Sequence, residues 1–167
     1  MNFTNLEQQI RQMLSASEAD ALGRVEQVCR FLHHHVEYYN WVGVYFAVHS
    51  RKELVLGPFV GEPTDHIRIP FGRGICGQAV QSEETFLIQD VAAQDNYLSC
   101  SIHVKSEIVV PVFRGDRVLA EIDIDSHVRD AFSEDDRWFL ESVAQMISPL
   151  MPDYDLDDPF ADVVIPY

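Results

Sequence analysis

The residues best suited to chemistry are a cysteine and a group of carboxylates in the second half of the chain. Cys100 lies six residues before the strand-like run 106–113, which contains Glu107, and Asp123 and Asp125 follow beyond the next turn. A thiolate is a nucleophile, and a protonated carboxyl can deliver a proton to a leaving group. A thiol close to several acids therefore favours a reaction that consumes protons.

The carboxylates are expected to share one face of a β-hairpin. Strands over 106–113 and 117–125 would flank a three-residue Arg-Gly-Asp loop, which places Glu107 opposite Asp123. Because side chains alternate along a strand, Asp125 falls on the same face. Like charges directly opposite each other destabilise a sheet, so stability alone does not explain this arrangement. Crowded carboxyls raise at least one pKa and keep a proton available near neutral pH.

The rest of the sequence predicts the elements that position these residues. Two N-terminal helices are expected, the first with Thr4 and Glu7 as a capping box and the second opening at Ser17. Ser133 and Asp136 predict the cap of a last helix. Aromatic and branched residues predict strands over 41–48, 53–56, 66–69 and 85–88, and a short helix over 75–81.

Residues 89–105 show no periodic pattern and predict a long loop of the kind that is usually functional or disordered, and this loop contains Cys100. The order of elements predicts an α+β fold, with a mostly antiparallel β-sheet, helices packed on one side and a long active-site loop. We expect a single domain with N-terminal helices over 1–150. Residues 151–167 form an acidic C-terminal tail, either a solvated end or a docking strand.

Composition limits the possible partners. Twelve basic against 27 acidic residues give a net charge of −15, which opposes binding to nucleic acid or to an anionic membrane surface. The N-terminus lacks a secretion signal and no run predicts a membrane span, so we expect a cytoplasmic protein. The cysteines, with no C-x-x-C motif, indicate neither a structural zinc site nor a secreted disulfide framework. The consecutive His33, His34 and His35 point in different directions and predict no metal site.

Five separated motifs stand out along the chain. They are Asn-Trp-Val-Gly-Val-Tyr at 40–45, Leu-Val-Leu-Gly-Pro-Phe at 54–59, Gly-Arg-Gly-Ile-Cys-Gly at 72–77, Ser-Glu-Ile-Val-Val-Pro at 106–111 and Asp-Ile-Asp-Ser at 123–126. In this order they make the chain resemble the GAF-domain free methionine-(R)-sulfoxide reductases. The resemblance covers roughly residues 20 to 150 and implies a GAF-like fold.

The resemblance implies roles for particular residues. In the family, a cysteine in the long loop attacks the sulfoxide sulfur, and Cys100 matches its place. The residues that match the family's substrate-binding set are Trp41, Tyr45, Glu107, Asp123 and Asp125. Reduction of a sulfoxide also needs an acid, for which Glu107 and Asp125 are the candidates, while Asp123 would hold the substrate ammonium. Trp41 and Tyr45 could alternatively be core aromatics.

Recycling of the enzyme would need a second thiol. Where family members with three cysteines carry one after the Gly-Pro-Phe motif, this chain has Thr64, which leaves Cys76 to form a disulfide with Cys100. A thioredoxin-type dithiol would reopen it, and no bound cofactor is expected. Cys76 could instead pack a tight turn, and Cys29 lies on the apolar stripe of a helix and is expected in the core.

Three functions remain open from the sequence. The first is reduction of free methionine-(R)-sulfoxide, with thioredoxin as a partner and a homodimer as a possible assembly. The second is a catalytically inactive GAF module that binds or senses a small ligand, because fold alone does not establish activity. The third is a regulator that acts through its acidic tail.

Overall fold

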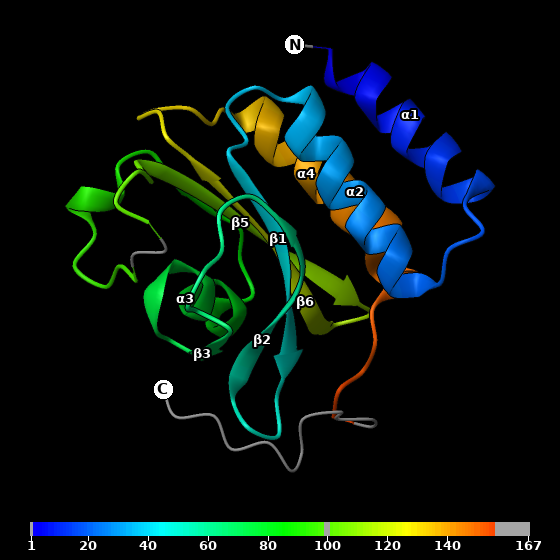
Figure 1. Cartoon of the computed structure of the whole chain (residues 1–167). Coiled ribbons are helices and arrows are strands. Elements are labelled where there is room, and N and C mark those ends of the chain that lie inside the picture. The colour runs from blue at the N-terminus through cyan, green and yellow to red at the C-terminus, as the bar shows by residue number, and fades with distance from the viewer. Residues whose placement is uncertain (1, 99–100, 156–167) are drawn as a thin grey trace.

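The computed structural model describes residues 2–98 and 101–155, which form an α+β fold around one antiparallel sheet (Figure 1). The strand order across the sheet is β3-β2-β1-β6-β5-β4, and every neighbouring pair is antiparallel. The predicted fold class is therefore confirmed. The strands are β1 Trp41–Val48, β2 Glu53–Val60, β3 Arg68–Pro70, β4 Phe86–Ile88, β5 Ser106–Arg114 and β6 Arg117–Ser126.

Helices cover both faces of the sheet unequally. The helices are α1 Phe3–Ala16, α2 Ala21–His35, α3 Gly74–Ser82 and α4 Glu134–Ile147. Helices α1, α2 and α4 lie together on one side, as predicted, and α3 lies on the other side (Figure 1). None of the helices within the described residues has both the length and the apolar character needed to cross a bilayer.

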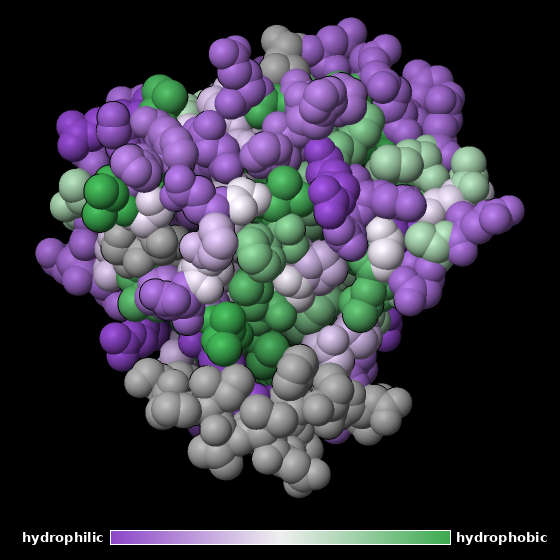
Figure 2. Space-filling view, viewed as in Figure 1, coloured by the Kyte–Doolittle hydropathy of each residue, from purple (hydrophilic) through white to green (hydrophobic). Residues whose placement is uncertain are grey.

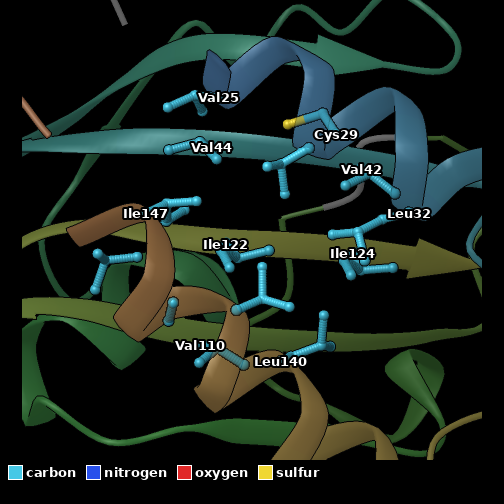
Figure 3. Packing of buried hydrophobic residues seen from close by; sticks show 14 of the residues in the cluster. Val25, Cys29, Leu32, Val42, Val44, Val110, Ile122, Ile124, Leu140 and Ile147 are labelled. Carbon is cyan, nitrogen blue, oxygen red and sulfur yellow. The ribbon is translucent and has the colours of Figure 1, made fainter. Parts of the chain in front are cut away.

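The larger core lies between the sheet and the pair α2 and α4 (Figure 3). On the sheet side this core includes even-numbered positions of β1 and β6, among them Val44 and Ile122, and on the helix side it includes Leu32 of α2 and Leu140 of α4. Odd-numbered positions of the same strands point to the opposite face, because side chains alternate along a strand. That second face, next to α3, carries the candidate site.

Much of the surface visible in Figure 2 is hydrophilic, in keeping with the excess of acidic residues. A band of hydrophobic surface runs down the middle of the same view, in the region where Figure 1 places β1 and β2. Residues of β2 from Leu56 to Val60 are only half-buried, which accounts for apolar surface there.

The predicted starts of the first two helices are wrong by a few residues. Helix α1 is capped by Asn2, whose Oδ1 accepts a hydrogen bond from the Asn5 backbone N–H at 3.1 Å, so Thr4 lies inside the helix. Helix α2 is capped by Asp20 and not by Ser17. Asn and Asp are N-caps as strong as Ser and Thr, so the pattern alone could not choose between neighbouring candidates. The capping box at the start of α4 is confirmed.

The register of the β5–β6 hairpin also differs from the prediction. The turn closes on an Arg114–Arg117 pair, and the register shifts beside Phe113, where Leu119 of β6 has no paired residue. Such a bulge adds one residue to one strand. As a result Glu107 pairs with Asp125 rather than with Asp123. The difference is two residues, an even number, so the acids remain on the predicted face.

The long loop and the start of the tail are both attached to the sheet. The loop contains a short 3-10 turn, Val91–Ala93, and its Lys105 N–H donates to the Ser126 carbonyl at 2.8 Å. In the tail, Asp155 accepts a hydrogen bond from the Ser50 backbone N–H at 2.8 Å and forms an ion pair with Arg117. Residues 156–167 lie outside the described residues, and the domain boundary at 150 stays a prediction.

A buried carboxylate ties α4 to the segment before β1. Asp136 is 1% exposed and accepts hydrogen bonds from the Tyr38 hydroxyl at 2.6 Å, the Tyr39 hydroxyl at 2.9 Å and the Ser133 N–H at 2.8 Å. Burial and the Asp136 carboxylate together raise the pKa of Tyr39 well above its usual value. One side chain therefore completes the capping box of α4, whose N-cap is Ser133, and accepts hydrogen bonds from two phenols.

We predict that Asp136→Ala lowers the free energy of unfolding by about 2–4 kcal/mol, because it disrupts the capping box and leaves two hydroxyls without their acceptor. Asp135→Ala is the matched control, since Asp135 lies in the same turn and is exposed. Its effect should stay within about 0.5 kcal/mol. Urea unfolding of the two variants measures the difference, and equal effects would contradict this role of Asp136.

Candidate active site

Four carboxyl groups gather on the face of the sheet that α3 covers. They are Glu107 of β5 and Glu121, Asp123 and Asp125 of β6, and none is more than 4% exposed. All four are odd-numbered residues of adjacent strands, with Glu107 paired to Asp125. The hairpin therefore gathers the carboxyls on a single face and removes them from solvent.

Helix α3 brings Cys76 onto this patch. The Cys76 Sγ lies 3.8 Å from Glu107 Oε1, and the thiol is 5% exposed. One donor atom each from Cys76, Glu107 and Asp123 lie within 4.8 Å of one another. The close packing of α3 depends on Gly77, where a Cβ would lie 2.5 Å from the Pro70 carbonyl oxygen. A side chain at that position would push the helix, and with it Cys76, away from the acids.

Burial controls the protonation of these acids. It raises the pKa of Asp123 from 3.8 to about 7 and raises the pKa values of Glu121 and Asp125 well above their usual range, with the neighbouring Asp123 charge adding to both. The pKa of Glu107 is raised by burial first and then by the charges of its three neighbours. The cluster thus holds protons at neutral pH, where an ordinary carboxyl is ionised.

Some oxygens of the cluster are unsatisfied. Oδ1 of Asp123 and Oδ1 of Asp125 have no hydrogen-bond partner within the described part of the chain. Buried polar atoms in native proteins are nearly always partnered, so unsatisfied ones at a single place indicate a site for a ligand or an ion.

Two aromatic side chains from β1 flank the acids. Trp41 pairs with Asp125 across the sheet and Tyr45 pairs with Glu121, with the two ring centroids 6.3 Å apart. The indole lies across Gly43, where a Cβ would be 2.2 Å from the Trp41 ring. The Trp41 Nε1–H donates to the Glu62 carbonyl at 3.0 Å, and the Tyr45 hydroxyl donates to the His66 carbonyl at 2.9 Å. Both rings are therefore held in fixed orientations beside the carboxyl groups.

A narrow cavity of about 20 Å³ lies at the edge of the cluster. This volume exceeds that of roughly one probe sphere, so it admits about one water. Thr64 is among the residues that line this cavity. The described lining residues are Asn40, Trp41, Glu62, Pro63, Thr64, Ser101, Val104, Asp125 and His127.

The long loop is fastened to the site on both sides of Cys100. Asn96 Oδ1 accepts from the Gly74 N–H at 3.1 Å, and its Nδ2 donates to the Gly72 carbonyl at 2.8 Å, so it bridges the turn before α3. On the other side the Ser101 hydroxyl donates to Glu62 Oε2 at 3.4 Å. Cys100 itself lies outside the described residues, and its role stays a prediction.

Six of the seven residues predicted for the site lie together on one face: Trp41, Tyr45, Cys76, Glu107, Asp123 and Asp125. Their individual chemical roles remain predictions. Sequence reasoning missed Glu121, although the same alternation that linked Asp123 to Asp125 extends to it. Cys29 lies in the other core, where burial above all raises its pKa to about 12, as expected for a packing residue.

Comparisons with known proteins identify the fold family. The model of the GAF domain family matches residues 24–151. The free methionine-R-sulfoxide reductase of Escherichia coli (strain K12) is 32% identical over 90% of this chain and 89% of that protein. The chain therefore belongs to the GAF-domain family that includes the free methionine-R-sulfoxide reductases, as its motifs predicted.

Comparisons with solved structures support the same family assignment. The structure of free methionine-R-sulfoxide reductase from Neisseria meningitidis, in complex with its substrate, has a TM-score of 0.83 at 32% identity, over 89% of this chain and 87% of that one. The type II free methionine-R-sulfoxide reductase from Thermoplasma acidophilum has a TM-score of 0.75 at 39% identity, over 78% of this chain and 91% of that one. The GAF-like fold predicted from the sequence is confirmed.

The raised pKa of Asp123 predicts a specific pH dependence of stability. Because its folded-state pKa is raised, the stabilising contribution of the protonated form is complete below about pH 4 and is lost as the pH rises through about 7. Asn imitates the neutral acid, so Asp123→Asn should gain stability relative to the wild type between about pH 4 and about pH 8, by on the order of 1–4 kcal/mol at about 1.4 kcal/mol per pKa unit.

Urea unfolding at several pH values in this range measures the effect. Asp65→Asn, the same substitution at an exposed position, is the matched control and should change the free energy of unfolding by no more than about 0.5 kcal/mol at every pH tested. If the difference in the free energy of unfolding between Asp123→Asn and the wild type did not change with pH, the raised pKa of Asp123 would be contradicted.

Proposed function

We propose that this protein reduces free methionine-R-sulfoxide to methionine. The observation that carries the proposal is the buried Cys76 thiol within hydrogen-bonding distance of a carboxyl cluster whose pKa values are raised. Thiols supply the reducing equivalents, and protonated acids supply the protons that turn the sulfoxide oxygen into water. The similarity to named reductases over most of their length supports the same assignment.

In the first step, the Cys100 thiolate attacks the sulfoxide sulfur while a protonated Glu107 or Asp125 donates a proton to the sulfoxide oxygen. The sulfur–oxygen bond of the substrate then breaks, the hydroxyl passes to the Cys100 sulfur, and the transient bond between the two sulfurs breaks, so that methionine leaves and Cys100 becomes a sulfenic acid. The substrate gains two electrons, which the Cys100 sulfur loses. Burial favours the protonated forms of Glu107 and Asp125 because it raises their pKa values.

In the second step, Cys76 attacks the sulfenic acid sulfur, which forms the Cys76–Cys100 disulfide and releases water. Glu107, 3.8 Å from the Cys76 Sγ, is placed to take the thiol proton after it has given up its own. A dithiol of the thioredoxin type then reduces the disulfide by thiol exchange and regenerates both thiols. This partner, a cytoplasmic location and a homodimer belong to the proposal.

Substrate recognition is assigned to the walls of the site. Asp123 would pair with the ammonium of the free amino acid, and Trp41 would contact the S-methyl group, since sulfur–aromatic contacts contribute roughly 0.3–1.5 kcal/mol. Methionine sulfoxide inside a peptide has no ammonium, so it would leave the Asp123 charge unpaired. The proposal therefore includes discrimination against peptide substrates.

A coupled assay with thioredoxin, thioredoxin reductase and NADPH tests the function. We predict NADPH consumption with free methionine-R-sulfoxide, and at least about 100-fold less with the S form or with a sulfoxide-containing peptide, because a misplaced reacting atom loses about that factor. Methionine formation is measured in parallel by chromatography. If the folded protein consumed NADPH with none of the substrates, the proposed reductase activity would be contradicted and the inactive ligand-binding module would be the remaining function.

Three cysteine variants separate the steps. Cys100→Ser should form no methionine, and Cys76→Ser should form one equivalent per chain and then stop. Cys29→Ala is the control, because Cys29 lies in the opposite core, and it should turn over as the wild type does. Full multiple turnover by Cys76→Ser with thioredoxin would contradict the proposed disulfide.

A further inference from the structure

Cys76 and its carboxyl neighbours are also a set of metal ligands. A thiol and the carboxyl groups of Glu107 and Asp123 place one donor atom each within 4.8 Å of one another, and all three residues are buried. They come from three different elements, α3, β5 and β6, which converge from two sides of one small volume. Buried donor sets of this kind differ from the surface acid pairs that occur on most acidic proteins.

The spacing fits a small tetrahedral ion. With Zn–S of about 2.3 Å and Zn–O of about 2.1 Å, two ligands of a tetrahedral zinc are separated by about 3.6 Å. The Cys76 Sγ and Glu107 Oε1 are 3.8 Å apart, so an ion between them requires only a small movement. The cavity beside Trp41 is lined by Asp125, which belongs to the same carboxyl cluster.

The unsatisfied oxygens are a second, independent indication. Asp123 Oδ1 and Asp125 Oδ1 are buried and have no hydrogen-bond partner in the described chain. The Glu121 carboxyl interacts with the same sulfur, because a hydrogen bond with the Cys76 thiol opposes the rise of the Glu121 pKa that burial causes. Such atoms supply the further donors that a cation needs after the first three ligands.

We propose that this cluster binds a thiophilic divalent cation, Zn²⁺, through the Cys76 sulfur and the carboxylates of Glu107 and Asp123, with Glu121 as the fourth donor. Zinc displaces the thiol proton and any carboxyl protons, which pass to solvent, and no electron is transferred. The sulfur ligand selects Zn²⁺ over Mg²⁺ and Ca²⁺, which prefer oxygen alone. The excess of acidic residues in the chain attracts cations in general.

A consequence for regulation rests on the proposed function. The ion occupies the resolving thiol and the acids that the reduction would use, so bound Zn²⁺ inhibits turnover reversibly and competes with the sulfoxide. A reductase of this design would therefore respond to the supply of thiophilic metal as well as to its substrate.

Metal binding is measured without reference to activity, in the Cys100→Ser background, where no disulfide can form. Co²⁺ is the probe, because a cobalt–thiolate bond gives a charge-transfer absorption band. We expect one Co²⁺ per chain with this band, displacement of Co²⁺ by Zn²⁺, and no displacement by Mg²⁺. Zn²⁺ should also raise the melting temperature of the same protein.

Variants in this background identify the ligands. Added Cys76→Ser should abolish the thiolate band, and Glu107→Gln or Asp123→Asn should weaken binding by at least about tenfold, as loss of groups that support a metal does. Added Cys29→Ala should change nothing. Circular dichroism verifies folding, and Glu121→Gln provides a further test if Cys76→Ser does not fold. A band that persists without Cys76, or no Co²⁺ binding by the folded protein, would overturn the proposal.

The coupled assay then separates this inference from the proposed function. Zn²⁺ binding by a protein without reductase activity would contradict the proposed function and support the metal site. Full activity with no effect of Zn²⁺ on turnover or on melting temperature would contradict the metal site and support the proposed function.

Discussion

The structure depends on keeping four neighbouring carboxyl groups out of water. Charged carboxylates that lie together in a dry interior lose hydration and repel one another, so the fold favours their protonated forms. Glu107, Glu121, Asp123 and Asp125 are all in this position, and burial is the largest cause of the raised pKa in each. The burial that is unfavourable for ionised carboxylates therefore places protonated carboxyl groups beside a thiol.

The two faces of the central strands have different roles, one in packing and one in the candidate site. Apolar residues at even positions of β1 and β6 pack against α2 and α4 and stabilise the sheet. That core allows odd positions of β6 to carry acids whose burial opposes stability. Helix α3 and the long loop then close the second face, with Gly77 permitting the close approach of α3 and Asn96 joining loop and helix.

Side-chain alternation was enough to predict that Glu107, Asp123 and Asp125 share one face, because a register change of two residues, unlike a change of one, leaves each side chain on its face. Trp41, Tyr45 and Cys76 were predicted from the resemblance of their motifs to a known family. The alternation rule would have added Glu121, had it been followed one more step. The exact pairing was not predictable, since the bulge at Leu119 depends on how the whole hairpin twists. The predicted helix starts were wrong for a different reason. Asn2 and Thr4 are both residue types that cap helices well, and only packing decides between them.

The direct test of this account is the protonation of the cluster itself. Carbon-13 NMR of labelled Asp and Glu carboxyls, assigned with Glu107→Gln and Asp123→Asn, follows each group through a pH titration. The account predicts that the Asp123 carboxyl titrates near pH 7 and that Glu107 and Asp125 remain protonated at neutral pH. If all of these carboxyls titrated between about pH 3 and about pH 5, as ordinary ones do, the central claim would be contradicted.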